Sequence, residues 1–169
     1  GKVKLKLGEA PKVVIAPGDS FADALSVAPL AALQGWPILL TPAAGPVPAE
    51  TTAALLALES SAILEVGTMV DPGLPEVSVE RVVGNDRYDT CARVAAYAES
   101  QGLSYANLGM ATGENFPDAL AAGPYLAQRS GILLLTRSSS VPGVIASRLL
   151  ERAEQVVSVT YMGLSPAVT

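Results

Sequence analysis

The chain has 169 residues, of which half are hydrophobic and only 16% are charged, so the composition excludes an intrinsically disordered protein. It has no histidine and a single cysteine, Cys91. This excludes Ser-His-Asp and Cys-His catalysis, His-ligated or thiolate-cluster metal sites and an intrachain disulfide, so we expect no metal and no cofactor. The formal net charge of −5 argues against nucleic acid or an anionic membrane as a partner.

Short apolar runs alternate with helical patterns along the whole chain. The first half predicts strand 12–16, a helix that extends to about residue 34, strand 37–41, helix 47–59 and strand 62–66. The second half predicts strand 79–83, helix 87–101, strand 105–111, helix 116–129, strand 132–136, helix 141–153 and strand 156–162. Because the strands are apolar throughout and alternate with helices, the pattern indicates an α/β fold with a mainly parallel sheet covered on both faces.

The sequence contains an internal duplication. Residues 14–41 recur as residues 109–136 at a constant offset of 95 residues, without a gap. Both phenylalanines of the chain, Phe21 and Phe116, occupy one equivalent position. Self-similarity at a fixed period is the signature of a repeated structural unit.

A Pro/Gly-rich stretch at 71–76, DPGLPE, is the linker candidate between the two copies. It divides the chain into a first repeat at 1–78, which is truncated at its N-terminal side, and a second repeat at 79–169. The duplication leaves open whether the copies form two lobes, share one sheet or make one compact pseudo-symmetric unit.

Each copy places a polar turn directly after its first strand. Ser20 and Asn115 precede the helices, and Asp23 and Asp118 follow three residues later, which is the spacing of a capping box. This pattern predicts helix N-caps. The same loops follow the carboxyl ends of strands, where α/β proteins bind ligands, so a small-ligand or hydrolytic site around the two aspartates is an alternative.

The arginines are unevenly distributed, since all seven lie from residue 81 onward. Arg81 and Arg87 flank the Val-Val-Gly-Asn-Asp turn. A guanidinium group binds phosphate or carboxylate through two parallel hydrogen bonds. A surface that carries several arginines can therefore bind an anion even on an acidic protein.

Three motifs follow one another in the second copy. They are RVVGNDRYDT at 81–90, ATGENFPDAL at 111–120 and GILLLT at 131–136, and the last two have counterparts in APGDSFADAL at 16–25 and WPILLT at 36–41. This series resembles the cell wall binding repeat 2 (CWB2) family, whose repeats begin with an RYxTA-like segment and continue through DALA to a PILLT strand. The first copy has no RYDT segment, so we expect a site built from both segments to be incomplete there.

The resemblance implies Rossmann-like modules, commonly in packed sets of three, that hold secreted surface proteins of Gram-positive or actinobacterial cells noncovalently to the cell wall. It implies a noncatalytic, extracellular protein. Its partners would be an anionic, teichoic-acid-like wall polymer and further modules of the same kind, in the same chain or in a homo-oligomer. Matched residue by residue, the resemblance assigns polymer binding to Arg81, Arg87, Tyr88, Ser20, Asp23, Asn115 and Asp118.

Overall fold

The computed structural model describes residues 11–68 and 77–163, so the linker candidate 71–76 lies outside the described residues. The first elements are β1 (Lys12–Pro17), α2 (Phe21–Gln34), β2 (Ile38–Thr41), α3 (Ala49–Leu58), β3 (Ala62–Val66) and β4 (Ser78–Val82). They are followed by α4 (Arg87–Ser100), β5 (Ser104–Thr112), α5 (Phe116–Leu120), α6 (Ala122–Ala127), β6 (Gly131–Thr136), α7 (Gly143–Glu151), the 3-10 turn η1 (Ala153–Gln155) and β7 (Ser158–Met162). The alternation of strands and helices predicted from the sequence is confirmed.

The strands form two parallel sheets, with the orders β2-β1-β3-β4 and β6-β5-β7. The two copies use the same register, because Val14 lies opposite Ile38 in the first sheet and the equivalent Gly109 lies opposite Leu133 in the second. The parallel arrangement was predicted, but the copies build separate sheets and do not share one. β4 belongs to the second repeat by sequence, yet it pairs with β3 in the first sheet.

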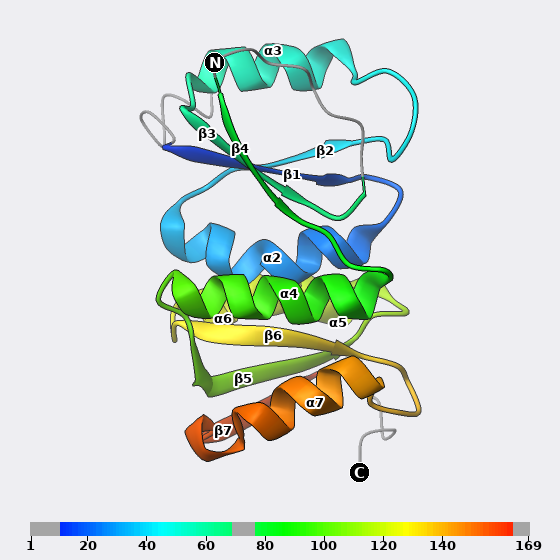
Figure 1. Cartoon of the computed structure of the whole chain (residues 1–169), viewed down its shortest axis with the longest axis vertical. Coiled ribbons are helices and arrows are strands. Elements are labelled where there is room, and N and C mark those ends of the chain that lie inside the picture. Colours follow the sequence, from blue (N-terminus) through cyan, green and yellow to red (C-terminus); the bar gives the residue numbers. More distant parts are fainter. Residues whose placement is uncertain (1–10, 69–76, 164–169) are drawn as a thin grey trace.

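The elements stack in layers, which gives the Rossmann-like arrangement (Figure 1). In Figure 1, α3 covers the outer face of the first sheet and α7 covers the outer face of the second. Helices α2, α4, α5 and α6 lie between the two sheets, where α2 packs against both α4 and α6. The sheets therefore share one helical layer.

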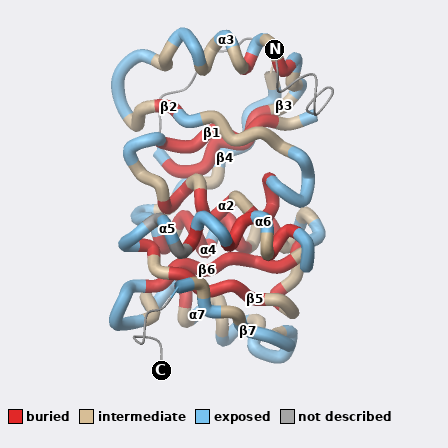
Figure 2. Tube along the Cα trace, turned by 180° about the vertical axis from the view of Figure 1, so that it is seen from behind, coloured by how far each residue is buried: buried red, intermediate tan, exposed pale blue. Residues whose placement is uncertain are grey.

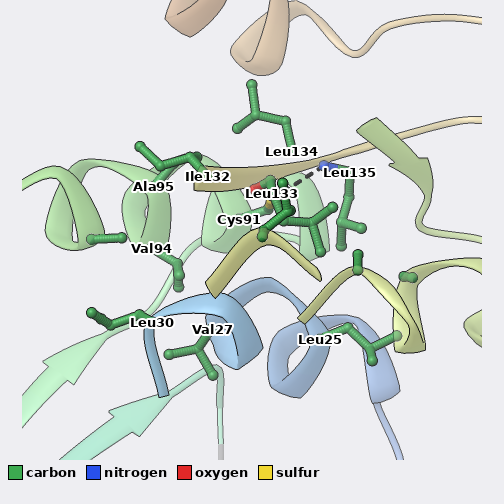
Figure 3. Packing of buried hydrophobic residues seen from close by; sticks show 14 of the residues in the cluster. Leu25, Val27, Leu30, Cys91, Val94, Ala95, Ile132, Leu133, Leu134 and Leu135 are labelled. Atoms are coloured by element: carbon green, nitrogen blue, oxygen red, sulfur yellow. Dashed lines mark hydrogen bonds between the residues drawn. The ribbon is translucent and has the colours of Figure 1, made fainter. Parts of the chain in front are cut away.

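The main hydrophobic core lies in this shared layer and draws on both copies. Figure 2 shows that the buried parts of the chain are concentrated in the strands and in the helices between the sheets. Val27 and Leu30 of α2 pack in one cluster with Val94 of α4 and Leu133 of β6, as Figure 3 shows from close by. Burying an aliphatic side chain contributes roughly 1.5–3 kcal/mol. The high apolar content of the chain is thus used to bury strands on both faces.

The lone cysteine is part of this core. The Cys91 thiol lies 3.5 Å from the Leu133 carbonyl oxygen and accepts a hydrogen bond from the Leu135 amide at 3.3 Å. Its complete burial raises the pKa of Cys91 to about 12, so the thiol does not ionise at neutral pH.

One expected element differs from the sequence prediction, since the helix over 116–129 is divided into α5 and α6. Pro124 alone does not explain the division, because the equivalent Pro29 lies inside the unbroken helix α2. The copies differ at the residue before the proline, where Gly123 replaces Ala28. Glycine is a poor helix former. Its missing side chain also lets α6 approach α2, because a Cβ atom at position 123 would lie only 2.9 Å from the Ala28 Cβ.

We expect Gly123→Ala to reduce the free energy of unfolding by about 1 kcal/mol, because the added methyl group must separate α6 from α2. Gly143→Ala is the matched control, since a Cβ there meets nothing within 4 Å. It should be neutral or slightly stabilising, by up to about 1 kcal/mol. Urea unfolding of the two variants measures the difference, and equal effects would contradict the close approach of α6 and α2.

Candidate functional site

The polar turns of the two copies are built in the same way at the carboxyl ends of their strands. Gly18 N donates to Thr41 O at 2.7 Å, and the equivalent Gly113 N donates to Thr136 O at the same distance. An acidic side chain also anchors each turn. Asp19 accepts from Ala43 N at 3.3 Å, and Glu114 accepts from Ser138 N at 3.1 Å. These bonds hold both turns in fixed positions. The sequence pattern had predicted either helix caps or a ligand site at these turns.

The turn between β4 and α4 contains a helix cap. The Asp86 carboxylate accepts hydrogen bonds from Tyr88 N at 2.9 Å and Asp89 N at 2.8 Å, and the Asp89 carboxylate accepts from Asn85 N at 2.9 Å. Gly84 makes the tight approach possible, because a Cβ there would lie 2.2 Å from a backbone nitrogen of α4. The capping bonds fix the direction in which α4 leaves the first sheet.

The β4–α4 turn of the second copy lies over the β1–α2 turn of the first, at the same end of the molecule (Figure 1). The two turns line a pocket of about 270 Å³ to which Ser20, Asp23, Arg87 and Thr90 contribute. The structure therefore brings together three of the residues proposed from the sequence. The first copy has no RYDT segment of its own, but the RYDT segment of the second copy lies at its polar turn and lines the same pocket.

Asp23 does not act as the capping acid that its spacing predicted. Ser20 makes no side-chain capping bond to α2, and its side chain instead hydrogen bonds to the Asp23 carboxylate. Asp23 is only 7% exposed, and its Oδ1 atom has no partner among the described residues. A buried carboxylate oxygen without a protein donor is costly to the fold unless a water molecule or a ligand supplies the missing hydrogen bond.

The surroundings of Asp23 have opposing effects on its pKa. Burial raises its pKa, and this effect exceeds the opposing contributions of the Ser20 hydrogen bond, the Arg87 charge and the Thr90 hydrogen bond. The Thr90 hydroxyl oxygen also accepts from Gly84 N at 3.1 Å, so the turn that carries the RYDT segment is connected directly to Asp23.

Arg87 lies between the turns of both copies. Its Nη1 atom donates to the Gly113 carbonyl oxygen at 2.6 Å, and its guanidinium group lies 5.7 Å from the centre of the Phe21 ring. Within the described part of the chain, no carboxylate forms an ion pair with Arg87. Its guanidinium group is thus positioned by a carbonyl group and an aromatic ring.

Arg137 was not identified from the sequence. It follows β6 directly and lies 5.5 Å from the centre of the Tyr88 ring, and it too forms no ion pair with a described carboxylate. Tyr88 is only 7% exposed, so it supports Arg137 more than it offers a surface of its own. Arg137 also lines an open pocket of about 630 Å³ next to the start of α7. Its position directly after the carboxyl end of a strand is the sequence feature that could have identified Arg137 as a candidate.

The remaining predicted residues lie elsewhere. Arg81 lies on β4 and forms a salt bridge with Glu65, whose side chain is only 5% exposed. Asn115 is exposed at the start of α5 and makes no capping bond with its side chain. The side chain of Asp118 lies outside the part of the structure that is described, so the pairing of Asp23 with Asp118 stays a prediction.

The raised pKa of Asp23 predicts a specific dependence of stability on pH. Because burial raises the folded-state pKa above the unfolded value, this carboxyl stabilises the fold at acid pH, and the contribution is lost as pH rises through the folded-state pKa. Relative to the unmodified chain, the free energy of unfolding of Asp23→Asn should therefore be higher at neutral pH than it is below the ordinary aspartate pKa of about 3.9. Urea unfolding at the two pH values measures this.

Asp89 is the control of opposite sign. Hydrogen bonds from the Asn85 backbone and from Arg93 lower its pKa, so its contribution is present at neutral pH and is lost in acid. Asp89→Asn should therefore be more destabilising at neutral pH than in acid. A pH-independent effect of Asp23→Asn, or one with the sign of Asp89→Asn, would contradict the burial of Asp23.

Comparison with known proteins adds to this geometry. A family model described as Cell wall binding domain 2 (CWB2) matches residues 2–70 and 81–169. Over 156 residues the chain is 30% identical to N-acetylmuramoyl-L-alanine amidase LytC of Bacillus subtilis (strain 168), covering 85% of this chain and 29% of that protein. The fold is similar to Cwp6 from Clostridium difficile, with a TM-score of 0.76, 24% identity and coverage of 90% of this chain and 25% of that chain.

Cwp8 from Clostridium difficile is similar as well, with a TM-score of 0.74, 23% identity and coverage of 99% of this chain and 29% of that chain. The chain spans less than a third of the length of each of these proteins. No helix within the described residues is long and apolar enough to cross a membrane.

The family match extends over both copies and includes the motifs that line the site. Domains of this family bind the cell wall in surface proteins of Gram-positive bacteria, which places the chain outside the cell, at the wall. The chain belongs to the cell wall binding domain 2 (CWB2) family.

Proposed function

We propose that this chain is a noncatalytic module that anchors a secreted protein to an anionic, teichoic-acid-like polymer of the wall. The observation that carries the proposal is the position of Arg87 and Arg137. Both guanidinium groups lie at the carboxyl ends of strands, and neither forms an ion pair with a carboxylate of the described residues. A cation held in place without an acidic partner suits an external anion.

The ligand we propose carries hydroxyl groups as well as charge. The unpartnered Oδ1 of Asp23 can accept a hydrogen bond from a hydroxyl, and Ser20 lies beside it in the same pocket. A carboxylate at this point repels a bare phosphate ion. A polymer that alternates anionic groups with sugar or polyol hydroxyls can place the anions on Arg87 and Arg137 and a hydroxyl on Asp23.

Recognition of the polymer by a few positioned side chains agrees with the composition of the chain. With a net charge of −5, the protein has no general attraction for polyanions. Recognition therefore depends on a few arginines whose positions are fixed by a carbonyl group or an aromatic ring. Such local contacts are weakened by salt, but they retain the specificity of directed hydrogen bonds.

We expect Arg87→Gln and Arg137→Gln each to reduce binding to purified cell walls by roughly 10- to 100-fold, since a hydrogen bond to a charged group contributes about 1.5–3 kcal/mol. Arg148→Gln is the matched control. It removes the same charge from α7, where Arg148 pairs with Glu151, and it should bind as the unmodified chain does. Cosedimentation at increasing salt concentration measures the affinities.

A second arm tests the polymer itself. Binding should fall when the anionic polymer is removed chemically from the walls, and it should be restored by adding back the purified polymer. Arg87 also contacts Gly113, so the melting temperature of each variant is measured to separate lost binding from lost folding. Undiminished retention on stripped walls, or an Arg148→Gln defect equal to that of Arg87→Gln, would refute the proposal.

A further inference from the structure

The pocket that contains Asp23 is acidic, although an arginine lies beside it. Three carboxylates line it, from Asp19, Asp23 and Asp86, whereas Arg87 supplies the cationic side chain among the described residues of its lining. The guanidinium group of Arg87 reaches toward the second copy, where its Nη1 atom donates to the Gly113 carbonyl oxygen at 2.6 Å. The lining of the pocket therefore carries more negative than positive charge.

The carboxylates of Asp19 and Asp86 are held in position without being neutralised. Asp19 Oδ1 accepts a hydrogen bond from the Ala43 amide at 3.3 Å. Asp86 Oδ1 accepts from the amides of Tyr88 and Asp89 at 2.9 and 2.8 Å. A backbone amide is an uncharged donor, and within the described part of the chain neither carboxylate forms a salt bridge. Both turns thus hold negative charge at fixed points of the pocket.

Asp23 adds a buried oxygen atom that lacks a donor. The residue is 7% exposed, and its Oδ1 atom has no hydrogen-bond partner among the described residues. The backbone makes room for this carboxylate, because a Cβ atom at Gly67 would lie only 2.4 Å from Asp23 Oδ2. A buried carboxylate with a free oxygen destabilises the fold unless a further group supplies the missing interaction. A donor that also carries positive charge supplies it most completely.

The arrangement of the acceptors suits an ammonium group better than a metal ion. Within the described residues, no group of three or more acidic, cysteine or histidine side chains is placed to hold a metal ion. Calcium needs six to eight oxygen ligands around it. An ammonium group needs only a few acceptors for its three N–H donors, and Asp23, Ser20 and Asn85 all place side-chain oxygens at this pocket.

We propose that this pocket binds an ammonium group of the wall polymer, so that the polymer carries amino groups as well as anions. The inference rests on the proposed function and narrows it, because the donor to Asp23 is then an ammonium group and not a hydroxyl. A hydroxyl donates one proton and brings no charge, so it leaves the excess of carboxylates uncompensated. Amino sugars and aminoacyl esters are the chemical classes that carry such a group.

The anionic and the ammonium positions lie next to each other on the protein. Asn85 and Asp86 line the pocket of Asp23 and also the pocket of Arg137, so the two pockets adjoin the same turn. A polymer whose charges are all negative is repelled by the carboxylates as it approaches Arg87. A polymer that alternates anions with ammonium groups meets charges of the opposite sign at both positions, which gives specificity among polyanions.

The test compares three sugar phosphates that differ at one carbon atom. Glucosamine 6-phosphate has an ammonium group there, glucose 6-phosphate has a hydroxyl, and N-acetylglucosamine 6-phosphate has an uncharged amide. Near neutral pH and without divalent cations, we expect the full chain to bind glucosamine 6-phosphate roughly tenfold more tightly than the other two, because charge-assisted hydrogen bonds are about twice as strong as neutral ones. Titration of the amide chemical shifts measures the dissociation constants.

Variants of the carboxylates show where the preference arises. Asp23→Asn should lower the ratio of the affinities for glucosamine 6-phosphate and glucose 6-phosphate to about one, because it removes the charge that attracts the ammonium group. Asp19→Asn should lower the ratio in part. Glu114→Gln is the matched control and should leave the ratio unchanged, because Glu114 accepts from Ser138 N in the equivalent turn of the second copy. A ratio measured on one variant is insensitive to a partial loss of folded protein.

Three results would overturn the inference: equal binding of the three sugar phosphates, binding of none of them, or a preference that survives Asp23→Asn. Tight binding of glucose 6-phosphate that appears only with added Ca²⁺ would also overturn it, because a divalent ion would then occupy the pocket. None of these results changes the binding of Arg87→Gln and Arg137→Gln to whole walls. Failure of the inference is thus distinguished from failure of the proposed function.

Discussion

The pairing of β4 with β3 is the interaction on which the rest of the structure depends. It places the opening strand of the second repeat in the sheet of the first, and the chain then passes directly into α4 in the layer between the sheets. The buried Glu65 carboxylate and Arg81 join the two strands through their side chains. Because of this crossover the two copies share one core and contribute jointly to one pocket.

The same crossover explains why the capping-box spacing forms a helix cap at the start of α4 but places a carboxylate in a buried pocket at the start of α2. Asp86 and Asp89 cap α4 through backbone amides, as their spacing predicts. Asp23 has the same spacing at the start of α2 but lies beneath the β4–α4 turn, where Ser20 and Thr90 contact it and one oxygen has no partner. A turn that another segment covers cannot keep its polar groups in water, so its acid becomes part of a buried site.

Much of the fold could be predicted from the sequence because its signals are local. Apolar runs of four to nine residues and helical periodicity located the strands and helices, and the duplication predicted a repeated structural unit. The division between α5 and α6 was missed, and so was the close approach of α6 to α2, because the missing side chain of Gly123 matters only against Ala28 of a distant helix. The candidate site was predicted in part. Arg87, Ser20 and Asp23 line one pocket, as the site prediction required. Arg81 instead forms a salt bridge within the first sheet. Arg137 was not predicted.

By itself the sequence determined the α/β class, the repeat, the family and the exclusion of histidine chemistry, since these follow from composition, order and spacing. Only the tertiary structure decided that the copies build two sheets and that the turn of one copy is completed by the RYDT segment of the other. Strand pairing between residues far apart depends on which edges and faces are left open after the local elements form. That information lies in the packing of the whole chain, and no short segment contains it.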